Sequence, residues 1–201
     1  MKNFFDKYEL YTDNDSKYCY PNSFVLINKL NIKDFNTLKS AEADFVSARL
    51  FELENQSIKG YFDKNHLYEI HKYLFQDLYD FAGMTRDEDI AKGDTKFCVH
   101  NFIEEQLFEF FDKINKINVQ KNTSKAEKID FLAYVMAELN IIHPFREGNG
   151  RAIREFVREY AQALDLTIQW NKINKEVLLD AMVESVFDTT VLKEILAKIL
   201  N

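Results

Sequence analysis

The chain has 201 residues, 46% of them hydrophobic, and a formal net charge of −7. Its length and apolar content favour one domain with a sizeable core. The acidic balance argues against general nucleic-acid binding, which needs a basic face to displace counterions. A nucleotide held in one local basic pocket stays compatible with it. No apolar run approaches the ~20 residues that a membrane helix needs, so we expect no membrane contact.

The cysteine content and the N-terminal residues indicate in which cellular compartment the protein is expected. Cys19 and Cys98 are the only cysteines, too few for a disulfide framework, and no spacing suggests a zinc site. Residues 1–7 lack the hydrophobic region of a signal peptide. We therefore expect a cytoplasmic protein, with export by a route that needs no N-terminal signal as the open alternative.

The scarcity of turn-forming residues indicates the fold class. Five glycines and two prolines favour long helices over many short strands. No linker or internal repeat marks a second domain. We predict a single all-α domain over residues 36–201, with residues 1–35 as an N-terminal arm packed on it.

Two amphipathic helices are predicted first. One spans residues 37–55, and the other follows Asp63, whose side chain suits an N-cap. Apolar residues spaced three and four apart give each helix a buried face. These faces comprise Leu38, Ala41, Phe45, Ala48, Leu50 and Leu53 in the first helix, and Leu67, Ile70, His71, Leu74, Phe75 and Leu78 in the second.

The stretch 84–100 breaks the helical period. Gly93 and Asp94 form a turn signal within it, and Ile90 and Phe97 suit strands. We predict a short β-hairpin there, called the flap below. A two-stranded hairpin is only marginally stable alone, so the flap should lean on the helical body.

A central helix is predicted after a helix over residues 102–114. Ser124 and Glu127 have the spacing of a capping box, and the helix that they open is apolar nearly all round. Pro144 ends it, because the residue before a proline disfavours helical geometry. His143 should therefore stand at its C-terminal end. Helices over residues 150–164, 174–186 and 189–200 complete the domain.

The segment 143–154 favours anion binding. Gly148 and Gly150 precede a helix, so backbone N–H groups and the positive end of the helix dipole converge there. Glycines also let phosphate oxygens approach the backbone. Arg151 and Arg154 add positive charge from the first turn, and residues 146–158 carry four arginines against two glutamates.

Glu147 and His143 indicate chemistry beyond anion binding. A carboxylate repels phosphate, so Glu147 makes sense if it holds a cation that bridges phosphates, and Mg²⁺ is the usual one. His143 takes up a proton near neutral pH. A polyphosphate, a metal ion and a base together describe the transfer of a phosphorus-containing group to a hydroxyl.

Each of these features also has a structural explanation. A lone histidine is more often structural than catalytic, and we interpret His66, His71 and His100 in that way. Glu155 and Arg158 are equally consistent with a solvated helix face. The concentration of so many of these residue types within twelve positions favours the functional interpretation.

The segment 143–154 resembles the motif of the Fic family, His-x-Phe-x-(Asp/Glu)-Gly-Asn-Gly-Arg-x-x-Arg, and matches every specified position. Similarity extends to the helix after Asp63 and to the flap, and covers roughly residues 20–190. The resemblance implies the all-α Fic fold, a helical bundle around a central buried helix with a β-hairpin flap. It also implies transfer of AMP from ATP to a Ser, Thr or Tyr hydroxyl of a target protein.

The resemblance also implies roles for individual residues. His143 is the catalytic base, Phe145 anchors the loop in the core, and Glu147 holds Mg²⁺ on the phosphates. Arg154 grips the γ-phosphate and is also catalytic. The residues implied to bind the nucleotide are Gly148, Asn149, Gly150, Arg151, Arg154, Lys92 and Gly93. The flap, residues 90–97, would add the target chain as a strand through main-chain hydrogen bonds.

Members of the family resemble one another in an inhibitory helix with the motif (Ser/Thr)-x-x-x-Glu-(Gly/Asn), whose glutamate pairs with the residue equivalent to Arg154. Thr190 and Glu194 have the first spacing, but Ile195 follows, and segments 123–128 and 50–55 also lack one element. We therefore expect a small separate antitoxin protein to supply the glutamate. The alternative is that the C-terminal helix is the inhibitor.

Other functions stay open at this point. A Fic-fold enzyme could transfer phosphate, UMP or phosphocholine instead, although the related phosphate-transferring branch has a lysine where Gly150 stands. A catalytically silent binding module is a third hypothesis. The biological setting could be a bacterial growth-arresting toxin or an effector acting on host proteins, and the lack of an appended secretion domain favours the first.

Overall fold

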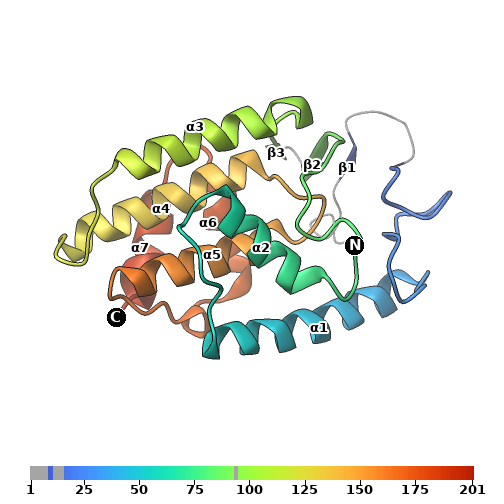
Figure 1. The fold of residues 1–201 in the computed structure, drawn as a ribbon, viewed down its shortest axis with the longest axis horizontal. Coiled ribbons are helices and arrows are strands. Elements are labelled where there is room, and N and C mark those ends of the chain that lie inside the picture. The colour runs from blue at the N-terminus through green and yellow to red at the C-terminus, as the bar shows by residue number, and fades with distance from the viewer. Residues whose placement is uncertain (1–8, 11–15, 93–94) are drawn as a thin grey trace.

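The computed structural model describes residues 9–10, 16–92 and 95–201. Within these residues seven α-helices and three short strands are present. In Figure 1, α1 and α3 lie at opposite edges of the bundle with α2, α4 and α5 between them. The predicted all-α fold with a small β element is confirmed. The elements are β1 Glu9–Leu10, α1 Phe35–Asn55, α2 Lys64–Phe75, β2 Ile90–Lys92, β3 Thr95–Lys96, α3 Ile103–Lys116, α4 Lys125–Ile142, α5 Asn149–Ala163, α6 Lys175–Glu184 and α7 Thr190–Ile199, with 3-10 turns at His100–Phe102 and Trp170–Lys172.

Aspartate side chains begin the first two helices. Asp34 Oδ1 accepts a hydrogen bond from Thr37 N at 2.8 Å, and Asp63 Oδ1 accepts one from His66 N at 2.9 Å. The predicted N-cap at Asp63 is confirmed. Each cap satisfies a helix N–H that has no intrahelical acceptor, which stabilises the helix by about 1 kcal/mol.

The predicted buried face of α1 is partly wrong. Phe45 is 38% exposed, whereas Val46 is buried. The residues of the inward face follow one another at spacings of three and four, and two of them, Glu42 and Arg49, are charged. Apolar periodicity misses this face because Arg49 is satisfied by Asp77 at 2.8 Å and Glu42 by a partner on α5. The residues of the inward face are Leu38, Glu42, Val46, Arg49 and Leu53.

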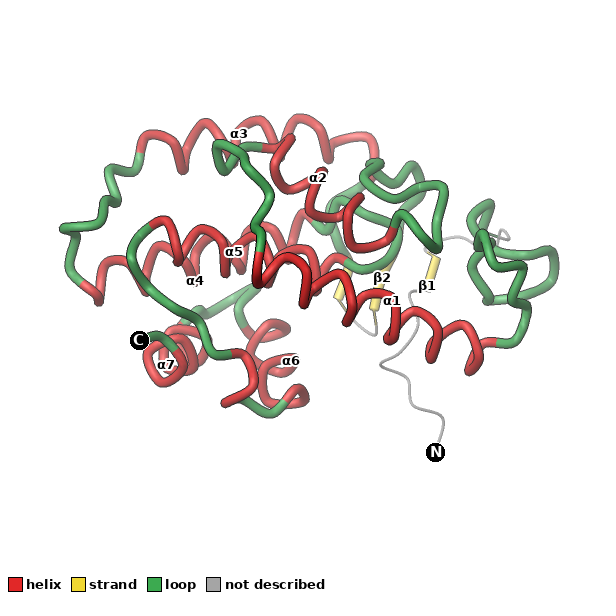
Figure 2. Tube along the Cα trace, turned by 60° about the horizontal axis from the view of Figure 1, so that its bottom comes forward, coloured by secondary structure: helices red, strands yellow, loops and turns green. Residues whose placement is uncertain are grey.

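Helix α4 is the centre of the bundle, as predicted. The Ser124–Glu127 capping box opens it, and residues on all sides of the helix are buried. It packs against α3, α5, α6 and α7, and Figure 2 shows it running alongside α5. Its buried apolar residues are Ile129, Phe131, Leu132, Ala133, Val135, Met136, Ala137, Leu139 and Ile142.

Helix α4 ends at His143, in agreement with the prediction from Pro144. His143 is the C-cap in the left-handed conformation, with φ 48° and ψ 60°, and its N–H still donates to Leu139 O at 2.9 Å. The left-handed turn at a non-glycine residue is uncommon. It redirects the chain sharply, so the histidine sits where the central helix meets the loop.

The flap lies in the predicted place but belongs to a three-stranded sheet. Strands β2 and β3 form an antiparallel hairpin, and β1 pairs antiparallel with the other edge of β2, with Leu10 opposite Ile90. Ile90 and Phe97 are buried, so the flap leans on the helical body. The predicted turn at Gly93 and Asp94 lies outside the described residues.

The described part of the N-terminal region contacts the segment before the flap. Lys29 N donates to Leu78 O at 2.8 Å, and Ser16 Oγ donates to Glu88 Oε1 at 2.8 Å. The division into residues 1–35 and 36–201 stays a prediction.

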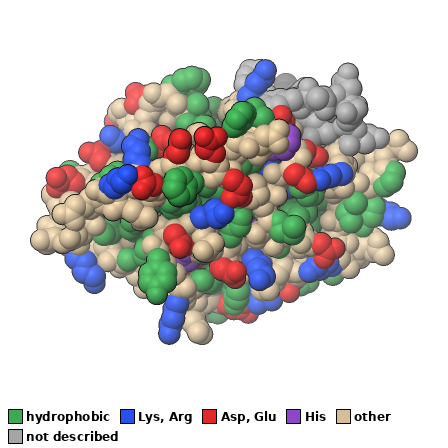
Figure 3. Space-filling view, turned by 45° about the horizontal axis from the view of Figure 1, so that its top comes forward, with side chains coloured by type: hydrophobic (Ala, Val, Ile, Leu, Met, Phe, Trp, Pro, Cys, Tyr) green, Lys and Arg blue, Asp and Glu red, His purple; other side chains and the backbone are tan. Residues whose placement is uncertain are grey.

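The surface is mixed in charge. On the face in Figure 3, Lys and Arg side chains are interspersed with Asp, Glu and scattered hydrophobic side chains. In the described ranges, no helix combines the length and the apolar character needed to cross a bilayer.

Candidate active site

The loop between α4 and α5 is closed by the side chain of Asn149. Asn149 Oδ1 accepts from Phe145 N at 2.8 Å, and Nδ2 donates to Phe145 O at 2.6 Å. Asn149 is fully buried. Its side chain therefore closes the loop, and the implied contact with a phosphate stays a prediction.

Phe145 anchors this loop in the core. It is fully buried, and its ring stacks on His71 with centroids 3.8 Å apart. His71 Nδ1 accepts from Gly83 N at 2.8 Å, so the ring hydrogen is on Nε2 and donates to Glu147 O at 2.9 Å. Burial lowers the pKa of His71 to about 3. A neutral histidine thus fixes the backbone of Glu147.

His143 is held in the tautomer that a base requires. Its Nδ1 lies 2.9 Å from Asn140 O, an acceptor, so Nδ1 carries the hydrogen and Nε2 carries the lone pair. Phe97 of the flap stacks on the ring at 3.7 Å. Burial, with smaller contributions from Arg86 and Lys92, lowers the pKa of His143 to about 3. The ring is therefore neutral at physiological pH, with a lone pair on Nε2, and the expectation that it takes up a proton near neutral pH is not met in the ligand-free chain.

The neutral state of His143 makes a testable contribution to the pH dependence of stability. Because its folded pKa of about 3 lies below the ordinary 6.5, the unfolded chain gains a proton below pH 6.5 that the folded chain does not. Stability contributed by this group therefore falls with falling pH, by up to about 1.4 kcal/mol per pH unit. Urea unfolding of wild type and His143→Gln, compared between about pH 7.5 and pH 5, should show a shallower slope in the variant. Equal slopes would contradict a neutral buried His143.

Glu147 is partly buried at the start of α5. Its Oε1 accepts from Gly148 N at 2.9 Å and lies 3.5 Å from Arg151 Nη2. Burial first, and the nearby Glu42 second, raise the pKa of Glu147. No group of three or more His, Cys, Asp or Glu side chains suited to a metal is found in the described residues. A single carboxylate still fits Mg²⁺, which is commonly held by one or two carboxylates together with substrate phosphates.

Two of the four arginines in the segment are turned to structural partners. Arg146 is buried and forms an ion pair with Glu88. Arg158 pairs with the buried Glu155 at 2.6 Å. The interpretation of Glu155 and Arg158 as a solvated helix face is therefore wrong, and only Arg151 and Arg154 are left to serve the anion site.

Arg151 and Arg154 differ in their partners. Arg151 Nη2 lies 2.6 Å from Glu42 Oε1, and its guanidinium lies over the Phe75 ring. Arg154 has no hydrogen bond or ion pair in the described part of the chain, and burial, then the neighbouring Arg151, lower its pKa to about 10. A partly buried cation next to another cation and without a counter-ion is costly unless an anion joins it. Arg154 is therefore the candidate anion-binding residue.

Gly148 is required by the geometry of this turn. Its φ is +77°, and a Cβ placed there would lie 2.2 Å from Phe75 Cζ. Gly150→Ala is the matched control, because its Cβ would meet only the flexible end of Arg154 at 3.3 Å. Gly148→Ala should lower the free energy of unfolding by at least about 2 kcal/mol, from the left-handed strain and the clash. Gly150→Ala should leave it unchanged or slightly higher. Urea titration measures both, and equal losses would contradict this account.

The flap residues are only partly placed. Lys92 lies on β2, partly buried, and is close enough to His143 to help lower its pKa. Gly93 lies outside the described residues.

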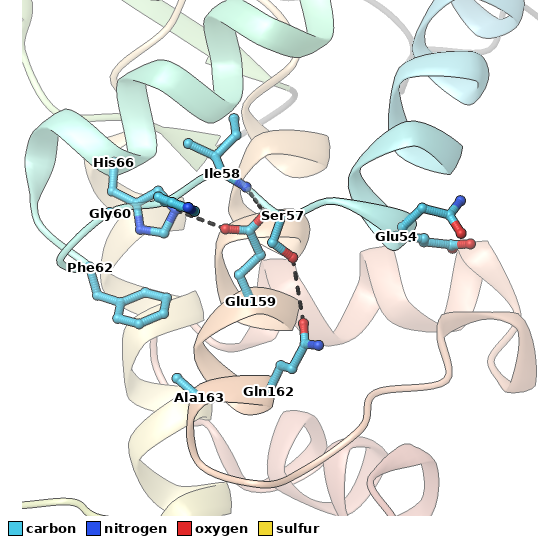
Figure 4. Close-up of a pocket in the computed structure, with 11 residues that line it drawn as sticks. Glu54, Ser57, Ile58, Gly60, Phe62, His66, Glu159, Gln162 and Ala163 are labelled. Carbon is cyan, nitrogen blue, oxygen red and sulfur yellow. Dashed lines mark hydrogen bonds and ion pairs between the residues drawn. The ribbon is translucent and has the colours of Figure 1, made fainter.

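A separate hollow of about 460 Å³ lies at the C-terminal half of α5. Figure 4 shows its polar floor: Glu159 accepts from His66 Nε2 at 2.8 Å and from Ile58 N at 3.1 Å, and Ser57 faces Gln162. Arg158 extends the same network to Leu53 O at 3.2 Å. These contacts fasten α5 to the α1–α2 connection, so they hold the helix that carries Arg151 and Arg154.

Sequence reasoning missed Glu42, His71 and Arg86 as supports of the site. Glu42 lies four residues from both Leu38 and Val46, a spacing that could have indicated the inward face had Val46 been chosen in place of Phe45. A charged residue on an inward face indicates a buried ionic partner. The buried Arg86, which contacts His143 O at 2.9 Å, carries no comparable pattern in the sequence.

Comparison with known proteins agrees with this geometry. The model of the Fic/DOC family matches residues 61–161. Protein adenylyltransferase VbhT of Bartonella schoenbuchensis is 36% identical over 177 residues, which cover 88% of this chain and 37% of that protein. The chain thus spans little more than a third of VbhT.

A second relative matches over nearly its whole length. "Probable protein adenylyltransferase Fic" of Escherichia coli is 31% identical over 186 residues, 92% of both chains. Among solved structures, BepC of Bartonella tribocorum with bound AMPPNP has a TM-score of 0.84 at 28% identity, covering 92% of this chain and 96% of that one. The motif, the fold and these matches agree: the chain belongs to the Fic/DOC family.

Proposed function

We propose that this chain is a protein adenylyltransferase that transfers AMP from ATP to a Ser, Thr or Tyr hydroxyl of a target protein. The observation that carries the proposal is Arg154, a partly buried cation without a counter-ion in the described residues, on the helix that follows the loop after the neutral His143. The names of VbhT and of the Escherichia coli relative, and the AMPPNP bound to BepC, support it.

The reaction assigns a task to each group. His143 Nε2 takes the proton of the target hydroxyl, whose oxygen forms a bond to the α-phosphorus. The bond from the α-phosphorus to the bridging oxygen breaks, and pyrophosphate leaves. Arg151 and Arg154 stabilise the charge that gathers on the leaving group. Glu147 would hold Mg²⁺, which when bound neutralises phosphate charge.

The backbone and the flap complete the proposed site. The N–H groups at the start of α5, from Gly148 to Gly150, face the phosphates. Lys92 and Gly93 bind the nucleotide from the flap, whose edge takes the target chain as an added strand.

Labelled ATP tests this function directly. With ATP labelled at the α-phosphate, incubation with a lysate should place label on a protein, and with the γ-phosphate it should not. Label from the γ-position would mean phosphate transfer, and label from α-labelled UTP in its place would mean UMP transfer. An absence of label from every nucleotide would favour a silent binding module. Mass spectrometry of the labelled protein identifies the target residue.

We also propose that inhibition comes from a separate small antitoxin protein, as in a toxin–antitoxin pair. Arg154 has no carboxylate partner in the described residues, and Glu194 on α7 is exposed to solvent. The purified chain should therefore be active alone, and Glu194→Gly should not raise its activity. An inert chain that Glu194→Gly activates would make α7 the inhibitor.

We also propose a cytoplasmic location, on the evidence of the two cysteines. Both cysteines are free thiols, and Cys19 is buried, as expected in a reducing compartment. Fractionation of the producing cell tests this part of the proposal.

A further inference from the structure

Arg86, in the segment that leads into the flap, is 2% exposed and among the largest fully buried side chains. Burying a guanidinium is costly unless its donors are satisfied. Here they reach backbone carbonyls of three separate segments. Nε donates to His143 O at 2.9 Å, Nη1 to Glu88 O at 2.7 Å, and Nη2 to Cys98 O at 2.5 Å.

Two of these carbonyls are the two feet of the flap. Glu88 lies just before β2, and Cys98 lies just after β3. The third belongs to His143, the C-cap of α4, whose carbonyl is one of those that a helix end leaves without an intrahelical donor. One planar, rigid group therefore ties both feet of the flap to the residue that carries the base.

Backbone hydrogen bonds continue this connection on both sides of Arg86. Arg86 N donates to Pro144 O at 2.8 Å, and Cys98 N donates to Ile141 O at 3.0 Å. Phe97, between the flap and Cys98, stacks on the His143 ring. The feet of the flap, the end of α4 and the imidazole are thus one connected unit.

We propose that Arg86 is a positioning residue that sets the flap in register with His143, and so places the target hydroxyl against the base. This inference rests on the proposed function, in which the flap holds the target chain. A base must lie within about 3 Å of the proton that it accepts. A displacement of about 1 Å costs on the order of 10² in rate. Arg86 donates to carbonyls at the feet of the flap and at the end of α4, whereas Arg151 and Arg154 lie on α5. Nucleotide binding should therefore depend on Arg86 much less than protein modification does, although the flap also carries Lys92.

The test compares Arg86→Lys and Arg86→Gln with wild type. Lysine keeps the charge but is a single point donor that cannot span three carbonyls. Both variants should lower kcat for protein modification at saturating ATP by about 10²-fold. The KM for ATP and the affinity for AMPPNP should stay within about threefold of wild type. Arg49→Lys is the control, because Arg49 bonds the Asp77 carboxylate just after α2 instead of a carbonyl at the flap, so this variant should leave kcat unchanged.

The outcomes separate this inference from the proposed function. Wild type that labels no protein from ATP overturns the proposed function and this inference with it. An active wild type with unchanged Arg86 variants overturns only the inference. If kcat and AMPPNP affinity fall by the same factor, or if neither variant unfolds cooperatively in urea, Arg86 supports the fold as a whole and the positioning role is wrong.

Discussion

Replacing His143 with alanine should lower the rate of AMP transfer to the target protein by about 10²–10⁴-fold, or 3–5 kcal/mol of transition-state free energy. The physical reason is the loss of the imidazole at the end of α4, whose tautomer leaves the lone pair on Nε2 available to the target hydroxyl. Nδ1 is committed to Asn140 O at 2.9 Å, so no rotation is needed before Nε2 accepts a proton. Label from α-labelled ATP on the target protein, followed over time, measures the loss.

The same variant should still bind nucleotide. The anion site is built from α5, whereas the His143 ring bonds Asn140 O on α4 and stacks on Phe97 of the flap. His100→Ala is the matched control. His100 pairs with Asp89 at 2.9 Å outside the stack on Phe97, so its removal should change the rate by no more than about threefold. Unchanged transfer in His143→Ala with intact AMPPNP binding would remove the histidine from the mechanism.

The helices were predictable because their determinants are local. The caps at Asp63 and Ser124 and the break at Pro144 each act within four residues, so the sequence alone located the start of α2 and both ends of α4. The flap was predictable for the same reason, since a turn signal and two strand-forming residues lie close together. The pairing of β1 with β2 joins residues 9–10 to residues 90–91, and a contact over such a separation leaves no periodic pattern.

The polar interior was less predictable, because burial of charge depends on partners that are distant in sequence. Glu42 can face inward because it pairs with Arg151, and Glu155 can be buried because it pairs with Arg158. Apolar periodicity assigns such positions to solvent. These ion pairs also change the expected site. Arg146 and Arg158, two of the four arginines in residues 146–158, bond structural carboxylates and are not available to bind an anion.

The task of Asn149 could not be read from the motif either. The resemblance implied contact with a phosphate, whereas the side chain forms both of its described hydrogen bonds with the backbone of Phe145. An amide has two N–H donors and two acceptor lone pairs, and the loop uses one of each, so the implied phosphate contact stays a prediction. The result is a closed turn whose buried Phe145 lies between His143 and Glu147 in the sequence.

Replacing Arg154 should weaken ATP binding without lowering stability, whereas replacing Arg158 on the same helix should lower stability. In the ligand-free chain, Arg154 is a partly buried cation beside Arg151 and lacks a counter-ion in the described residues, so it is electrostatically unfavourable. Arg154→Gln should therefore leave the free energy of unfolding unchanged or higher. Its affinity for ATP should fall by about 10–150-fold, the effect of 1.5–3 kcal/mol for a hydrogen bond to a charged group. Affinity for AMP, which lacks the outer phosphates, should change little.

Arg158→Gln is the contrast on the same helix face, one turn further along α5. Arg158 is paired with Glu155 at 2.6 Å and donates to Leu53 O at 3.2 Å. Removing one partner of a buried pair leaves an uncompensated charge, so this variant should lose about 3–5 kcal/mol of stability. Urea unfolding without ligand, and with ATP, ADP or AMP, measures both effects. If Arg154→Gln destabilises the ligand-free chain as Arg158→Gln does, or if its ATP affinity is unchanged, Arg154 is a structural arginine and the anion-binding position lies elsewhere.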